Sequence, residues 1–176
     1  MKNVSYSVDN AHAKRGISVF MRETFGPNPP VLACIGTDAV IGDSLGPLVG
    51  SFCEDRLRGK TFVYGTFSHP VTAMDVEPLV KFLKTVHPSV KILAIDAAVG
   101  AVDEIGTIRM SDRPLKPGAG VDKNLSVVGD ANVIAVVAER SSSGALGLVR
   151  LSKVYEAAKV IADGICDYYL SACASE

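Results

Sequence analysis

The sequence lacks the charge excess and the long apolar runs that mark nucleic-acid-binding and membrane proteins. Its 18 Lys and Arg residues nearly balance its 19 Asp and Glu residues, which leaves a formal net charge of -1. No surface field that gathers phosphates or anionic lipids is therefore expected. The N-terminal residues contain no apolar segment of signal-peptide length, and runs such as residues 133–138 are too short to cross a bilayer. These absences predict a cytoplasmic protein with no nucleic-acid or membrane partner.

Cysteine is scarce, and its spacing lacks the CxxC pairs of zinc sites and redox motifs. The four cysteines all lie in apolar stretches, at Cys34, Cys53, Cys166 and Cys173. A thiol in such a stretch usually packs as a small hydrophobic side chain. We therefore expect reduced thiols in the core, and neither a zinc site nor a disulfide framework.

Repeats, linkers and low-complexity tracts are also missing. With 176 residues, of which 48% are hydrophobic and 21% charged, the composition is that of an ordinary globular protein. A chain of this length buries most of its apolar surface in one core. The sequence therefore predicts a single domain over residues 1–176.

Continuously apolar segments alternate along the chain with segments of helical spacing. An apolar run without alternation is typical of a parallel strand that is covered by helices on both faces. Strands are predicted at residues 31–35, 61–64, 90–95, 106–110 and 132–137, and helices at residues 10–25, 47–57, 75–86 and 147–170. Residues 106–110 alternate in polarity, as an edge strand would, and the direction of this strand is left open. The pattern predicts an α/β protein, a three-layer α/β/α sandwich with a mostly parallel central sheet.

Two aspartates lie where such a sheet places its ligand site, beyond the carboxyl ends of its strands. Asp43 precedes a predicted helix at the end of a glycine-containing loop, and Asp96 closes an apolar strand. Taken singly, Asp43 could cap the helix and Asp96 could anchor a loop. Two carboxylates that converge at one site can instead share a proton or bind one cation, because like charges at close range do not both ionise cheaply. That arrangement would permit acid/base chemistry on a water molecule.

The two aspartates lie in motifs that resemble those of the spore germination protease, an atypical aspartic-type peptidase with two essential aspartates. The similar segments follow in the same order and spacing, and comprise Gly36, residues 43–47, 95–97, 111–112, 116–121 and 132–136. In length and motif set the chain resembles the YyaC, or spore protease, family of sporulation proteins. That resemblance implies a sporulation-associated endopeptidase, in the forespore or spore core, whose Asp43 and Asp96 activate water for peptide-bond hydrolysis.

The resemblance also implies a fold like that of the hydrogenase maturation proteases, in which carboxylates at these two sites and a histidine bind nickel. The later loop of this chain offers Glu139, Arg140 and Ser141 and no histidine. We therefore expect no metal and no cofactor. The chain is also much shorter than the germination protease, so the resemblance does not define a substrate.

Four further residues are candidates for substrate binding. His69 follows the second predicted strand and could approach the same crevice, although a lone loop histidine is more often solvated. Lys116, Gly118 and Gly120 lie in a loop that resembles a backbone anion nest, although glycine also serves ordinary turns. We predict contacts between these residues and a protein or peptide substrate.

Two other functions remain open from the sequence. In one, the carboxylates recognise a metal held by a client protein, as in a maturation endopeptidase. In the other, the crevice binds a peptide or small ligand without catalysis, as a non-enzymatic spore protein would. The sequence also leaves the oligomeric state open, and the chain could form a homo-oligomer.

Overall fold

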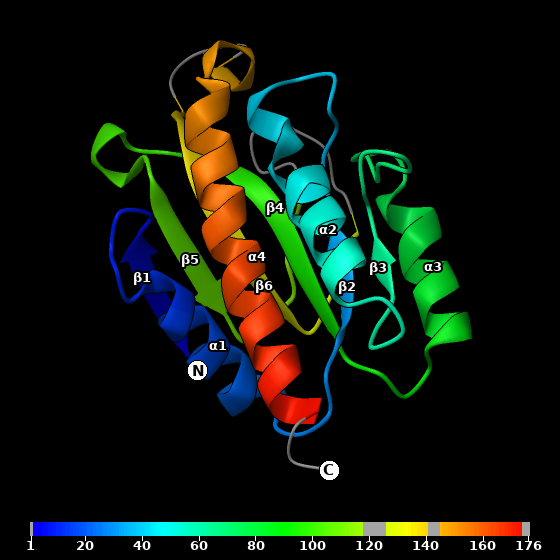
Figure 1. Ribbon diagram of the computed structural model, residues 1–176. Coiled ribbons are helices and arrows are strands. Elements are labelled where there is room, and N and C mark those ends of the chain that lie inside the picture. The colour runs from blue at the N-terminus through cyan, green and yellow to red at the C-terminus, as the bar shows by residue number, and fades with distance from the viewer. Residues whose placement is uncertain (1, 118–125, 141–144, 174–176) are drawn as a thin grey trace.

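A six-stranded sheet in the order β1-β5-β6-β4-β2-β3 forms the centre of the structure (Figure 1). The computed structural model describes residues 2–117, 126–140 and 145–173. The strands are β1 (Asn3–Ser7), β2 (Val31–Cys34), β3 (Val63–Tyr64), β4 (Ile92–Gly100), β5 (Thr107–Ser111) and β6 (Ala131–Glu139). The helices are α1 (Ala13–Phe25), α2 (Leu45–Arg56), α3 (Val76–Val86) and α4 (Leu151–Cys173), with short 3₁₀ turns η1 (Gly42–Ser44), η2 (Val102–Glu104) and η3 (Ala145–Leu148).

The sheet is mostly parallel, as predicted. The neighbouring strands β6, β4, β2 and β3 run parallel to one another. In contrast, β5 is antiparallel to β6 and to β1. The direction that the sequence left open for residues 106–110 is therefore antiparallel.

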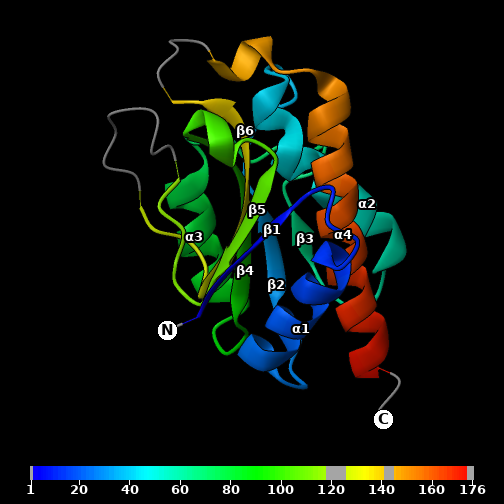
Figure 2. The ribbon, with the colours of Figure 1, turned by 90° about the vertical axis from the view of Figure 1, so that its left-hand side faces the viewer.

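Helices cover both faces of the sheet, which confirms the predicted α/β sandwich. Figure 2 shows α3 on one side of the strands and α1, α2 and α4 on the other. The larger core cluster joins the sheet to α1, α2 and α4 and includes Ile17, Val49 and Ile161. The smaller cluster joins the opposite face to α3 and includes Leu79 and Leu83.

Strand β4 contributes side chains to the core clusters on both faces of the sheet. Its residues alternate between the two faces, since successive side chains of a strand point to opposite sides. Leu93 and Ile95 belong to the larger cluster, and Ala94 belongs to the cluster with α3. Both faces of the strand are buried, which is why its sequence reads as a continuous apolar run.

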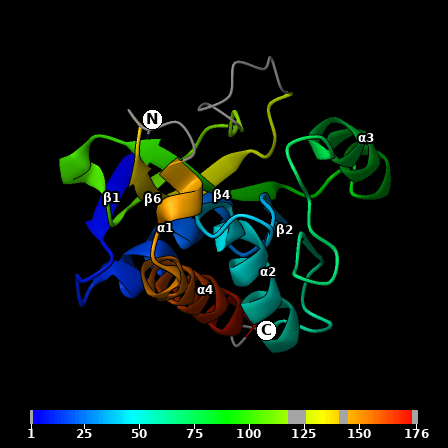
Figure 3. The same cartoon turned by 90° about the horizontal axis from the view of Figure 1, so that it is seen from above.

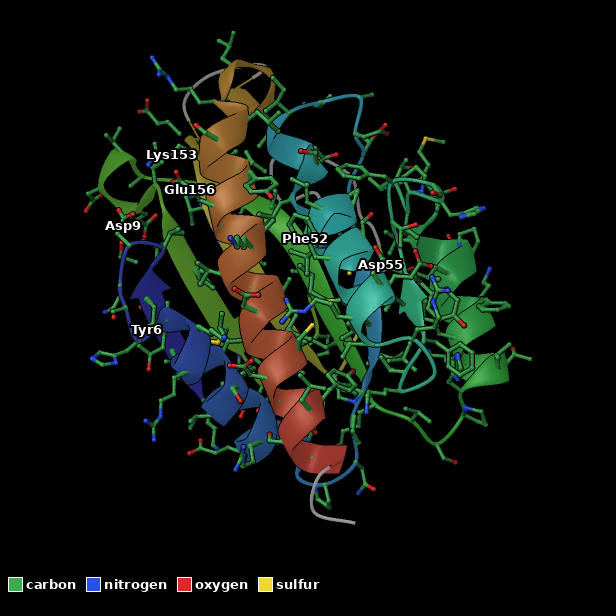
Figure 4. The ribbon with its side chains drawn as sticks, viewed as in Figure 1. Tyr6, Asp9, Phe52, Asp55, Lys153 and Glu156 are labelled. Carbon is green, nitrogen blue, oxygen red and sulfur yellow. The ribbon has the colours of Figure 1, made fainter. Side chains whose placement is uncertain are left out.

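Strand β1 was missed by the sequence analysis. It pairs with β5 at the edge of the sheet, with Val4 opposite Met110 and Tyr6 opposite Ile108. Figure 4 shows Tyr6 beside α1, where its ring packs against Gly16. Its five residues alternate between exposed and half-buried positions, and its place in the sheet comes from pairing with β5, which is distant in sequence.

The buried thiols agree with the prediction of a reduced core. Cys34, Cys53 and Cys166 are free and buried. They lie in the larger cluster, between β2, α2 and α4. The side chain of Cys173 lies outside the described residues.

Within residues 2–117, 126–140 and 145–173, no helix is both long enough and apolar enough to span a membrane. The longest of them, α4, has 23 residues and packs against α1 and α2.

Candidate active site

Asp43 lies in the η1 turn, between the carboxyl end of β2 and the start of α2. Figure 3 looks onto this end of the sheet and shows the loop that leads into α2 beside β2. The backbone N–H of Thr37 donates to the carbonyl oxygen of Asp43 at 3.1 Å, which closes the loop. The Ser44 hydroxyl donates to the Ile41 carbonyl oxygen at 2.6 Å. These bonds hold a half-buried Asp43 carboxylate at the strand end.

Two glycines allow this loop to pack against the end of β2. Gly36 has φ of 140°, and a Cβ at this position would overlap the carbonyl oxygen of Asp43. A Cβ on Gly46 would overlap the carbonyl oxygen of Ile35. Only a residue without a side chain permits such close approach. The two glycines therefore fix where Asp43 lies relative to the sheet.

Asp96 lies within β4 and not at its end, which corrects the sequence prediction. Strand β4 continues to Gly100 because its second half pairs with β6, where Asp96 lies opposite Ile134. The pairing of β4 with β2 ends one residue earlier, at Ile95 and Cys34. Asp96 is therefore the first residue of β4 beyond the carboxyl end of β2.

The Asp96 side chain points to the α3 face of the sheet. Alternation along β4 places it on the same face as Ala94, and its partner Ile134 packs against the cluster that contains α3. The side chain is only 7% exposed. The backbone N–H of Ala97 donates to its Oδ1 at 2.8 Å. A carboxylate with so little solvent and a single hydrogen bond from the described residues is costly to keep charged.

The charge of Asp43 acts on the buried carboxyl group of Asp96. Burial raises the pKa of Asp96 well above its usual value, the charge of Asp43 raises it further, and only the hydrogen bond from Ala97 lowers it. Burial also raises the pKa of Asp43, while hydrogen bonding with the Thr37 backbone lowers it. No described Lys or Arg forms a salt bridge with either carboxylate. The pair therefore favours a state in which one proton is retained.

His69 lies at the same end of the sheet, with its side chain exposed. Its loop follows β3 and returns to β2, where Val71 pairs with Ile35 and accepts a hydrogen bond from the Gly36 N–H at 2.8 Å. Among the described residues, no three His, Cys, Asp or Glu side chains form a group that could hold a metal ion. His69 therefore does not complete such a group with Asp43 and Asp96.

Lys116 is exposed at the edge of the α3 face. Its neighbour Leu115 exchanges backbone hydrogen bonds with Val128 at 2.8 and 2.9 Å, and both residues are buried in the cluster that contains α3. Lys116 thus approaches the face to which Asp96 points. Gly118 and Gly120 lie outside the described residues.

Comparison with known proteins relates the chain to a family that spans both acids. A family model described as a protein of unknown function, DUF1256, matches residues 4–164. The chain belongs to the DUF1256 family. It is also 38% identical, over 154 residues, to the uncharacterized protein YyaC of Bacillus subtilis (strain 168). The matched region covers 85% of this chain and 73% of YyaC. The predicted membership of the YyaC family is confirmed, while peptidase activity and kinship with the maturation proteases stay predictions.

The sequence analysis of this DUF1256 chain missed three apolar residues near the acids. Ile41, Phe67 and Met74 are exposed in the loops around the end of β2. Apolar residues in loops carry no periodic signal, and their exposure appears only once the fold is known. This end of the sheet thus carries two acids and three exposed apolar residues, and two such acids can serve as general acid and general base.

Proposed function

We propose that this DUF1256 protein is a sporulation-associated endopeptidase in which Asp43 and Asp96 share one proton and activate water. One observation carries the proposal: Asp96 is buried, its pKa is raised well above the usual value, and the charge of Asp43 contributes to that rise. Paired carboxylates with this electrostatic coupling are the working groups of aspartic peptidases. The role in sporulation, in the forespore or spore core, rests on the motif resemblance.

The different burial of the two acids supports different roles for them in the proposed reaction. Asp96 is the more deeply buried and retains the proton, so it acts as the general acid. Asp43 is half-buried, so its carboxylate can meet both water and substrate and acts as the general base. Burial raises the pKa of both acids, but more strongly that of Asp96, so Asp96 holds the shared proton and Asp43 starts the reaction ionised.

Peptide hydrolysis by this pair proceeds in two steps. Asp43 takes a proton from water as the water oxygen attacks the peptide carbonyl carbon, and Asp96 donates its proton to the carbonyl oxygen. In the resulting gem-diol, Asp96 takes a proton back from one hydroxyl and Asp43 gives its proton to the amide nitrogen. The C–N bond then breaks and leaves a carboxylic acid and an amine. The pair returns to its singly protonated state.

A metal-recognising endopeptidase is the second candidate function. Two carboxylates without a described cationic partner are suitable oxygen ligands for a divalent ion carried by a client protein. In that case cleavage would require the metal-loaded client. The two functions therefore differ in their response to a chelator.

The proposed activity is tested by mixing the purified protein with a forespore extract and mapping new peptide termini by mass spectrometry. Asp43→Asn and Asp96→Asn variants serve as matched controls, because each keeps the side-chain shape and removes one titrating group. We expect new termini with the wild-type chain that are missing with both variants. A wild-type chain that binds extract peptides without creating termini would instead indicate a non-enzymatic binding protein.

A further inference from the structure

Three exposed apolar side chains gather around the end of β2 that carries the candidate acids. Ile41, Phe67 and Met74 are 39%, 44% and 78% exposed. Isolated exposed apolar residues are common on protein surfaces and need no explanation. These three differ because their loops are joined to one another at Gly36. The Gly36 N–H bonds the Val71 carbonyl oxygen, and Gly36 packs directly against the Asp43 carbonyl oxygen.

Ile41 and Phe67 border the site on the side of α2. Ile41 starts the η1 turn that contains Asp43, and its carbonyl oxygen accepts the Ser44 hydroxyl bond that stabilises this turn. Phe67 is held beside α2, since its backbone N–H donates to the Ser51 hydroxyl at 3.0 Å. Both positions are therefore fixed by contacts of their backbone while their side chains face solvent.

Met74 borders the site on the side of α3. It lies three residues after Val71, in a turn closed by a hydrogen bond from the Thr72 N–H to the Asp75 carboxylate at 2.9 Å. This turn leads directly into α3, whose face of the sheet is the one to which Asp96 points. The three residues thus lie at the sheet end that carries the acids, two on the side of α2 and one on the side of α3.

We propose that Ile41, Phe67 and Met74 are specificity residues that bind apolar side chains next to the scissile bond. This inference rests on the proposed peptidase function. Substrate sites are lined mainly by apolar groups together with a few polar ones, and here three exposed apolar residues lie in the loops at the sheet end that carries the two acids. Burial of an apolar substrate side chain against them removes apolar surface from water on both partners. Substrates with apolar residues at the cleavage position are therefore favoured over polar ones.

The chain supplies a matched control in Phe62. Phe62 is also an exposed phenylalanine, at 61%, and it lies just before β3, whereas Phe67 lies just after it. Its ring contacts His87, with 4.9 Å between ring centroids, at the end of α3. Phe62 and Phe67 thus have the same chemistry at opposite ends of one strand. Only Phe67 lies at the end with the acids.

The test uses a library of amine-blocked peptides from a proteome digest, incubated with the wild-type chain and with Phe67→Ser, Met74→Ser and Phe62→Ser. Cleavage positions are mapped by mass spectrometry, and kcat/KM is measured for one cleaved peptide and for its analogue with serine at the preferred apolar position. We expect the wild-type chain to prefer the apolar peptide. Phe67→Ser or Met74→Ser should lower kcat/KM for it by about 10-fold, the range found for lost apolar contacts. Phe62→Ser should not.

The outcomes separate this inference from the function on which it rests. Cleavage without a preference for apolar residues would contradict the proposed specificity residues but not the peptidase activity. An equal loss of kcat/KM in Phe62→Ser and Phe67→Ser would have the same meaning. A wild-type chain that cleaves no more than Asp96→Asn would overturn the peptidase and the inference with it. Thermal unfolding of each variant shows whether a loss comes from unfolding instead of from altered binding.

Discussion

Gly36 lies so close to Asp43 that any side chain at position 36 would overlap the Asp43 carbonyl oxygen. Gly36→Ala should therefore displace the η1 turn and destabilise the fold by about 1 to 3 kcal/mol, the usual cost of overpacking. Urea unfolding measures this change. Gly106→Ala is the control, because Gly106 also has a positive φ but has no atom near its missing Cβ. An equal loss of unfolding free energy in Gly36→Ala and Gly106→Ala would show that backbone conformation alone requires glycine at position 36, and not the contact with Asp43.

The buried acid Asp96 should make the protein less stable as pH rises. Its pKa is raised in the folded state, so between the unfolded and folded pKa values the folded chain binds more protons than the unfolded chain. Stability is then greatest below the unfolded pKa and falls as pH rises through the folded pKa. Asp96→Asn removes the cost of ionising a buried carboxyl group and should therefore be more stable than wild type at pH 8. The difference should shrink near pH 4.

Asp75→Asn provides a control with the opposite sign. Hydrogen bonds from the Thr72 hydroxyl and backbone lower the pKa of Asp75, so its charge adds stability above the unfolded pKa that is lost as pH falls through the folded pKa. This variant should be less stable than wild type at pH 8. If Asp96→Asn also lowers stability at pH 8, Asp96 is a structural anchor, and its description as an acid that is costly to ionise is wrong.

Peptide cleavage should follow a bell-shaped pH profile. Activity requires one proton on the pair, so it falls at low pH as the Asp43 carboxylate is protonated and at high pH as the Asp96 proton is lost. The raised pKa values of both acids move the whole profile upward from that of two ordinary carboxyl groups. Asp43→Asn and Asp96→Asn should each lower kcat by at least about 100-fold. A profile that stays flat through the acidic range would exclude the pair as the titrating groups.

Chelators and metal ions distinguish the two candidate functions. If the acids share a proton, cleavage should persist in EDTA, and Ni²⁺ or Zn²⁺ should not raise the melting temperature. A metal that binds the folded chain alone would instead stabilise it by mass action. Loss of cleavage in EDTA, together with thermal stabilisation that Asp43→Asn abolishes, would favour metal recognition over proton sharing.

Much of the fold could be predicted because the central strands are buried on both faces. The apolar runs of β2 and β6 and the helical spacing of α2 and α3 predicted the positions of these elements to within a few residues. The edge strand β1 was missed, since its place at the edge of the sheet depends on pairing with β5, which is distant in sequence. The extent of β4 was also underestimated. Residues 97–100 have little strand character of their own and become a strand through pairing with β6.

The acids of the site could be predicted, but not their surroundings. Asp43 and Asp96 stand out as polar residues next to apolar strands, and the topology of a parallel sheet brings such positions together. The burial of Asp96 depends on the length of β4 and on the layer that contains α3, which the sequence does not encode locally. The exposure of Phe67 and Met74 depends likewise on how the loop after β3 returns to Gly36.

Carbon-13 NMR titration of the aspartate side chains tests the central claim most directly, since it reports the protonation of Asp96 without a substrate. In the wild-type chain, the Asp96 carboxyl should titrate well above the usual range. In Asp43→Asn its pKa should fall, because one repulsive charge is gone, yet remain above the ordinary value because burial persists. An Asp96 pKa that is the same in wild type and Asp43→Asn would show that the two acids are not coupled, and would contradict the account.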